Sequence, residues 1–220
     1  MSVHREGVTS MGEQQGPAAR VPLIEESEAT GRTAELYDLI KSRTGLPFVP
    51  DMFRLVSTRP DLMEVLITGY TGVFNDGVLP RATREMISAW SSKVNGCPYC
   101  VGTHNWFLSQ FGGSEELTHA IATADKPGEL PLDERTLALM ELVTQVCTGA
   151  YRITDEDWDR VAAAGWSNEE MLEAVFTAGL FAFINRLVDG FGLGTSMTRS
   201  RISRQSDADA GADGGAGTAA

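Results

Sequence analysis

The sequence predicts an all-α fold, because its apolar residues recur at helical spacings and its Pro and Gly residues fall between the resulting segments. In the segment 86–94, Met, Ile, Trp and Val occupy the first, second, fifth and ninth positions, which lie on one face of a helix. Met140, Val143 and Cys147 repeat this pattern at spacings of three and seven. No segment shows the alternation of a strand. We therefore expect one all-α domain in which short connections join antiparallel neighbours.

Four helices are expected in the first half of the chain, with Pro or Gly between them. The fourth should end at Asn95-Gly96, because Gly readily adopts the left-handed conformation that terminates a helix. The expected ranges are Glu26–Lys41, Asp51–Ser57, Asp61–Phe74 and about Pro80 to Asn95.

Further helices are expected directly after Gly96, over Ser114–Ala124, after Asp133 as far as Gly149, and from Thr154. Ser167, with Glu170 three residues later, forms a capping box that opens a long helix reaching Phe191. The middle of this helix is apolar all round, so we expect it in the core or in a subunit interface.

Both ends of the chain differ in composition from this body. Residues 1–20 are polar and lack periodicity, and residues 201–220 are small and acidic. Such segments bury too little apolar surface to offset the entropy of ordering, so disordered termini are expected on either side of a domain spanning 21–200.

The net charge of −12 and the absence of a Lys/Arg cluster argue against a nucleic-acid partner. The longest apolar stretch, Ala174–Ile184, has 11 residues and is too short to span a bilayer, so no membrane association is expected. The N-terminus lacks the apolar segment of a secretory signal. The chain has three cysteines, two of them three positions apart. Together with the lack of a secretory signal, this spacing favours a reducing, cytoplasmic location in which paired thiols are catalytic or bind metal.

The segment that carries chemistry is NGCPYC, where one helix stops at Gly96 and the next begins at once. Pro98 suits the first helical turn, where its missing N–H would have no partner anyway. Cys97 therefore falls at the N-cap and Cys100 within the first turn. We expect the positive end of the helix dipole to lower the thiol pKa values and make these cysteines reactive.

His104 and Glu85 are candidate partners of the thiols. At 100° per residue, Cys100 and His104 lie about 60° and 20° from Cys97 around the helix axis, so all three share one face. An imidazole there can accept the thiol proton or deliver a proton to a leaving group. Glu85, on the preceding helix, can orient that imidazole as a third group.

Structural alternatives remain open for the same residues. Cys97, Cys100 and His104 can supply three zinc ligands, with His119 or water as the fourth, although structural zinc sites usually draw on two separated knuckles. His104 can be a packed histidine, and Glu85 a solvated helix charge. Cys147 falls on an apolar stripe, which indicates a buried, inert thiol. We expect no metal and no cofactor.

The spacing of Glu85, Cys97, Cys100 and His104 resembles the signature of the alkylhydroperoxidase D (AhpD) family within the carboxymuconolactone decarboxylase superfamily. The flanking segments VPLIEESEATGRTAELYDLI and FAFINRLVDGFG resemble its peroxidase-related branch. The resemblance covers about Val21 to Thr195, and the cysteine motif is its most specific part.

This resemblance implies a compact AhpD-like helical domain that assembles as a homotrimer or hexamer and acts as an antioxidant, peroxiredoxin-type oxidoreductase. In the family, the cysteine matching Cys100 attacks an organic hydroperoxide and the one matching Cys97 resolves the sulfenic acid into a disulfide. Positions matching His104 and Glu85 relay protons, and a dithiol or lipoyl protein restores the thiols. The best-known members carry a histidine between the two cysteines, where this chain has Tyr99. The alternative function is a lyase or isomerase acting on a small carboxylated lactone, for which the paired thiols are not needed.

Overall fold

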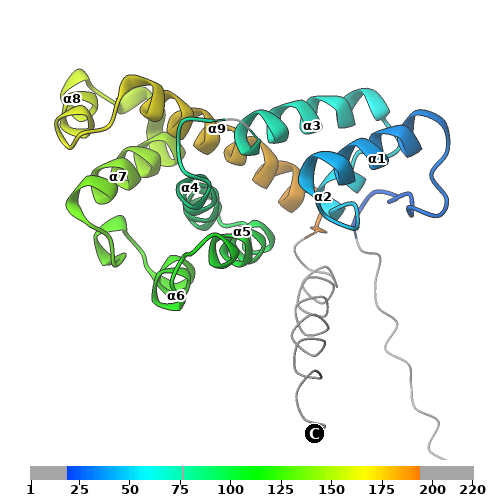
Figure 1. The fold of residues 1–220 in the computed structure, drawn as a ribbon, viewed down its shortest axis with the longest axis horizontal. Helices are drawn as coiled ribbons and strands as arrows, with labels where there is room; N and C mark the ends of the chain where they lie inside the picture. Colours follow the sequence, from blue (N-terminus) through cyan, green and yellow to red (C-terminus); the bar gives the residue numbers. More distant parts are fainter. Residues whose placement is uncertain (1–18, 76, 194–220) are drawn as a thin grey trace, which may run out of the picture.

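The computed structural model describes residues 19–75 and 77–193, and over these residues the chain is built from helices and their connections (Figure 1). No described residue lies in a strand, so the predicted all-α fold class is confirmed. The α-helices are α1 (Gly31–Thr44), α2 (Asp51–Arg54), α3 (Pro60–Phe74), α4 (Arg81–Val94), α5 (Pro98–Gln110), α6 (Glu115–Thr123), α7 (Glu134–Gly149), α8 (Asp155–Ala163) and α9 (Asn168–Gly190), and two 3-10 turns are η1 (Pro127–Glu129) and η2 (Ala150–Arg152).

Side-chain caps fix the starts of the later helices where the sequence predicts them. The Ser114 and Asp133 side chains accept hydrogen bonds from the backbone N–H groups of Leu117 and Thr136, at 3.1 and 2.7 Å. A capping box opens α9 at Ser167, as predicted. Such a cap provides a partner for a backbone N–H that the first helical turn leaves free, which is why these boundaries are readable locally.

The expected helix over Glu26–Lys41 is wrong at both ends, because α1 begins at Gly31 and continues to Thr44. Tertiary contacts hold the residues before it in an irregular conformation. The Glu26 carboxylate accepts a hydrogen bond from the Val49 backbone N–H at 2.8 Å, and the Ile24 N–H donates to the Ser57 hydroxyl at 3.0 Å. Neither partner is adjacent in sequence, so local periodicity does not reveal the boundary.

Two hydrophobic clusters make up the core, and α9 runs through both. The first contains α1 to α3, the two hairpin cysteines and the C-terminal half of α9. The second contains residues of α4, α6, α7 and α8 with the N-terminal half of α9. In Figure 1, α9 crosses the molecule from the side of α7 and α8 to that of α1 and α2, with α4 and α5 beside its middle. The α4–α5 hairpin therefore lies where the two clusters meet.

An 18-residue window of α9 has a mean hydropathy of 1.5, so among the described residues this helix is long and apolar enough to cross a membrane by length and composition. Within the fold, however, 44% of that window is buried, and α9 packs against α3, α4 and α7. A core helix meets the same criterion, so this property does not indicate a span. The expected disordered segments 1–20 and 201–220 lie outside the described residues, apart from residues 19 and 20.

Candidate functional site

The turn between α4 and α5 has the predicted form. Asn95 ends α4, Gly96 adopts the left-handed conformation with φ = 77°, and Cys97 is the N-cap of α5 with Pro98 as its first residue. The Cys97 backbone N–H donates to the Ser92 carbonyl at 2.9 Å, which ties the start of α5 to the end of α4. The turn thus brings the first turn of α5 alongside the end of α4.

Both hairpin thiols are free and buried, with Cys97 fully enclosed and Cys100 3% exposed. The expectation of a lowered pKa is wrong for Cys100. Its contact with the Cys97 thiol and its burial hold the pKa of Cys100 well above the ordinary range for a thiol. Both effects disfavour the thiolate, because a second sulfur nearby and an apolar surrounding leave a negative charge poorly solvated.

Glu85 and His104 form the predicted pair across the hairpin. The Glu85 side chain is fully buried, and its Oε2 lies 2.6 Å from His104 Nδ1. A carboxylate at this distance favours the tautomer in which Nδ1–H donates to it, and in that tautomer Nε2 is free to act as a base. No side chain among the described residues hydrogen-bonds Nε2. Glu85 is therefore an orienting carboxylate and not a solvated helix charge.

Arg81, which the sequence analysis did not single out, completes this pair. Its Nε and NH2 groups lie 2.7 and 2.6 Å from Oε1 of Glu85, and its NH1 donates to the Phe74 carbonyl at 3.0 Å. Each oxygen of the buried carboxylate is thus bound by a different partner. The signal available in the sequence was the four-residue spacing between Arg81 and Glu85, which places them on one helix face.

Aromatic rings fix the orientation of the His104 imidazole. The ring stacks on Phe74, with centroids 5.6 Å apart and an interplanar angle of 11°, and meets Phe181 edge-on at 4.5 Å. The guanidinium of Arg81 lies over two phenyl rings, with its central carbon 4.6 Å from the centroid of Phe74 and 4.8 Å from that of Phe111. These contacts join α3, α4, α5 and α9, so sequence spacing alone does not predict them.

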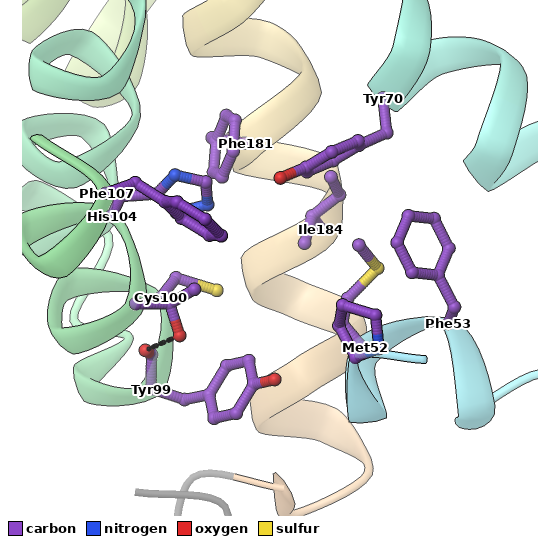
Figure 2. Close-up of a pocket in the computed structure, with 11 residues that line it drawn as sticks. Met52, Phe53, Tyr70, Tyr99, Cys100, His104, Phe107, Phe181 and Ile184 are labelled. Carbon is purple, nitrogen blue, oxygen red and sulfur yellow. Dashed lines mark hydrogen bonds between the residues drawn. The ribbon is translucent and has the colours of Figure 1, made fainter. Parts of the chain in front are cut away.

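Cys100 and His104 line one small, largely apolar cavity of about 30 Å³, which has room for one or two water molecules. Figure 2 shows the Cys100 sulfur directed from α5 towards α9, with the His104 ring one turn further along α5. The cavity wall consists mainly of aromatic and aliphatic side chains. The lining residues are Pro50, Met52, Phe53, Tyr70, Tyr99, Cys100, Thr103, His104, Phe107, Phe181 and Ile184.

Tyr99, which lies between the two hairpin cysteines, is part of this wall. Its side chain extends from α5 towards Met52 and α2 (Figure 2), and it is buried in the first hydrophobic cluster. Burial raises the pKa of Tyr99 well above its ordinary value. The phenol therefore keeps its proton at neutral pH and does not serve as a second proton acceptor.

Asn185, on α9, is hydrogen-bonded to the end of α4 beside the hairpin. Its side chain is 1% exposed, its Nδ2 donates to the Ser92 hydroxyl at 3.0 Å, and its Oδ1 accepts from Asn95 Nδ2 at 3.0 Å. These contacts span about 90 positions in sequence, so helical spacing does not predict them.

The other candidate residues lie away from this centre. Cys147 is on α7, half-buried against the second cluster, and burial raises the pKa of its thiol. His119 lies on α6 and lines a separate groove with Glu116 and Glu129. Within residues 19–75 and 77–193, no group of three or more His, Cys, Asp and Glu side chains is arranged to hold a metal ion. The zinc alternative therefore has no support from the donor geometry.

The chain thus combines an all-helical fold with a buried thiol pair and a carboxylate–imidazole pair, and comparisons with known proteins show what it is similar to. The sequence model of the Carboxymuconolactone decarboxylase family matches residues 60–128, which span α3, the α4–α5 hairpin and α6. No curated protein matches the chain. The match supports the predicted resemblance to the carboxymuconolactone decarboxylase family over these residues.

Three solved structures illustrate the shared fold. An AhpD core, an uncharacterized peroxidase-related protein from Ralstonia eutropha, has a TM-score of 0.72 and 22% identity, covering 80% of this chain and 92% of its own. A peroxidase-related protein from Silicibacter sp. has a TM-score of 0.66 and 18% identity, covering 87% and 95%. The debrominase Bmp8, in complex with 2,3,4-tribromopyrrole, has a TM-score of 0.65 and 17% identity, covering 90% and 99%.

Proposed function

We propose that this protein is a thiol peroxidase that reduces organic hydroperoxides by cycling a disulfide between Cys97 and Cys100. One observation carries the proposal: Cys100 lines the same apolar cavity as His104, whose Nδ1 lies 2.6 Å from the buried carboxylate of Glu85. A nucleophile, a base and a group that orients the base are the parts that thiol chemistry requires.

In the first step, the Cys100 thiol proton passes to Nε2 of His104. The sulfur then attacks the terminal oxygen of the hydroperoxide, so that an S–O bond forms as the O–O bond breaks. The alkoxide leaves and takes the proton from the imidazolium, giving an alcohol and a cysteine sulfenic acid. Glu85, bound by Arg81, stabilises the imidazolium that exists between the two proton transfers.

In the second step, the Cys97 sulfur attacks the Cys100 sulfenic acid. An S–S bond forms, the S–O bond breaks, and hydroxide leaves as water with the proton that Cys97 gives up. The contact between the two thiols across the first turn of α5 supports a disulfide between them, and the presence of Cys100 in the cavity lining supports its role as the attacking thiol. A dithiol or a lipoyl-bearing protein then returns both cysteines to thiols by exchange and is itself oxidised to a disulfide. We further propose that the working form is a homotrimer or hexamer.

The apolar cavity favours an organic hydroperoxide over hydrogen peroxide, because its aromatic wall can bury an alkyl or aryl group. At about 30 Å³ the cavity is smaller than such a substrate. Movement of side chains in the wall must therefore accompany binding.

The proposal is tested by measuring consumption of cumene hydroperoxide in the presence of a dithiol. Replacing the nucleophile in Cys100→Ser should reduce consumption to the rate without protein, because a hydroxyl does not attack the peroxide bond. Cys147→Ser is the matched control and should retain full activity, since Cys147 lies in the second cluster. Undiminished activity in Cys100→Ser would exclude the mechanism, whereas a wild-type protein that consumes no hydroperoxide would favour the thiol-independent lyase alternative.

A second candidate is thiol-dependent reductive debromination, suggested by the similarity in fold to the debrominase Bmp8. In such a reaction the dithiol supplies two electrons, bromide leaves, a proton takes its place on the ring and the thiols become a disulfide. Bromide release from 2,3,4-tribromopyrrole by the reduced protein, without hydroperoxide consumption, would favour this candidate over the peroxidase.

A further inference from the structure

The cavity beside Cys100 approaches the surface of the molecule on one side. Most of the residues that line it are buried, and the exceptions are Pro50, Thr103 and Phe107, which are partly exposed. Thr103 and Phe107 lie one turn apart on α5, and Pro50 directly precedes α2. The opening of the cavity therefore lies between α5 and the start of α2.

Of the three residues at this opening, Phe107 has the side chain that moves most readily. The Thr103 hydroxyl donates to a backbone carbonyl of its own helix at 2.9 Å, and Pro50 is a rigid ring at the N-cap of α2. The Phe107 ring has no polar atom and is in contact with two other rings, with centroids 4.9 Å from Trp106 and 6.0 Å from His104 (Figure 2). Such ring contacts are individually weak, so turning Phe107 outwards costs less than shifting a helix.

Cys100, His104 and Phe107 follow one another along one face of α5, and all three line the cavity. At 100° per residue, His104 and Phe107 lie about 40° and 20° to either side of Cys100, with rises of about 6 and 4.5 Å between successive members. A hydroperoxide has its parts in a matching order: the terminal oxygen, the oxygen that leaves and the organic group. A terminal oxygen at the Cys100 sulfur therefore puts the leaving oxygen beside His104 and the organic group where the Phe107 ring lies.

We infer that Phe107 is a specificity-determining residue: its ring closes the cavity, and when the ring turns outwards, the space that it leaves receives the organic group of the hydroperoxide. The closed cavity of about 30 Å³ has room for one or two water molecules, whereas the space of a phenyl ring accepts an aryl group or a branched alkyl group of similar size. The inference rests on the proposed use of Cys100 as the nucleophile.

The first test compares how fast a bulky and a small reagent alkylate Cys100, in a protein whose other two cysteines are changed to serine. Phe107→Ala removes the ring that must move aside, so N-phenylmaleimide, which carries an aryl group, should react about tenfold faster, the gain expected when an aromatic contact no longer has to break. Iodoacetamide needs less room and should gain no more than about twofold. Phe176→Ala makes the same change at an exposed position in the N-terminal half of α9 and should leave both rates unchanged.

Hydroperoxide specificity gives a second readout, in the protein with all its cysteines. Hydrogen peroxide is little larger than the water for which the closed cavity has room, whereas cumene hydroperoxide needs the space of the Phe107 ring. Phe107→Ala should therefore raise kcat/KM for cumene hydroperoxide relative to hydrogen peroxide. Phe107→Trp, which fills the opening further, should lower this ratio.

A merely structural role of Phe107 gives a different result. If Phe107→Ala changes both alkylation rates by the same factor, or changes neither, the size of the reagent does not matter and the inference is overturned. Should this variant fail to fold, Phe107→Leu keeps more of the apolar contacts and must still favour the larger reagent. Alkylation needs no peroxide, so failure of the peroxidase proposal would appear separately, as size-dependent alkylation without hydroperoxide consumption.

Discussion

The two halves of α9 lie in different surroundings, and the difference locates the chemistry. At its N-terminal end the polar groups are exposed and form hydrogen bonds with residues close in sequence, as in the capping box between Ser167 and Glu170. In its C-terminal half, Asn185 is buried and bound to Asn95 and Ser92 on another helix. Local caps stabilise one helix, whereas buried long-range hydrogen bonds fix how helices sit together and are costly when incomplete.

Ion pairs repeat this contrast. Arg59 and Asp61 pair at 2.6 Å on the surface, where solvent weakens the attraction, so such a pair contributes little to stability. Glu85 pairs with Arg81 and His104 in the interior, where removing one partner leaves an uncompensated charge. A buried charge that is fully paired beside a cavity points to function more than to stability.

The largest effect is expected from Glu85→Gln, which removes the buried charge while keeping the side-chain volume. The neutral amide no longer stabilises the imidazolium of His104, so hydroperoxide consumption should fall by about a hundredfold or more. Steady-state rates with cumene hydroperoxide measure this loss. Glu170→Gln makes the same change in the exposed cap of α9 and should leave the rate unchanged.

The pH dependence sharpens this prediction. Because the pKa of Cys100 lies above the ordinary thiol range, its thiolate fraction, and with it the rate, should rise with pH from 6 to 9. If Glu85→Gln kept the wild-type rate across this range, a role for the carboxylate in the proton relay would be ruled out.

A smaller effect, on stability, is expected from Glu173→Gln. Glu173, in the N-terminal half of α9, binds α4 and the residues just before it. Its Oε2 accepts hydrogen bonds from the backbone N–H groups of Val78 and Leu79 at 2.6 and 3.1 Å, and Nε of Arg84 lies 3.5 Å from its Oε1. Losing this charge should lower the free energy of unfolding by about 1–3 kcal/mol. Urea denaturation measures it, with exposed Glu169→Gln as the control; equal stability of the two variants would contradict the assignment.

The smallest effect is expected from Ser167→Ala, which removes the N-cap of α9. The loss should be about 1 kcal/mol of folding stability, with hydroperoxide consumption unaffected, because the cap lies at the far end of α9 from the cysteines. Ser114→Ala removes a similar cap from α6 and provides the comparison. Thermal unfolding and the peroxidase assay together check the outcome. Lost activity in a folded variant would contradict the claim that the N-terminal end of α9 takes no part in the chemistry.

Most of the fold was predictable from sequence, because its helices carry local signals. The capping residues of α6 to α9, the left-handed Gly96 and Pro98 all act on neighbouring backbone groups. The start of α1 was not predictable, since Glu26 is held by contacts with Val49 and Lys41.

The site was predictable where one helix or one turn arranges it. Helical spacing places Cys97, Cys100 and His104 together, and the short turn brings Glu85 to them. The contribution of α9 depends on packing between distant segments, so Asn185 was not assigned to the site. The raised pKa of Cys100 was missed because the helix dipole is a local signal, whereas burial and the Cys97 contact are tertiary.

The most direct test of the central claim is a thiol titration of the purified protein before and after one equivalent of cumene hydroperoxide, with mass spectrometry to locate any new bond. Of the three thiols in the chain, two should disappear, and the peptides containing Cys97 and Cys100 should be joined while Cys147 stays free. Three unreacted thiols after exposure to the hydroperoxide would contradict the account.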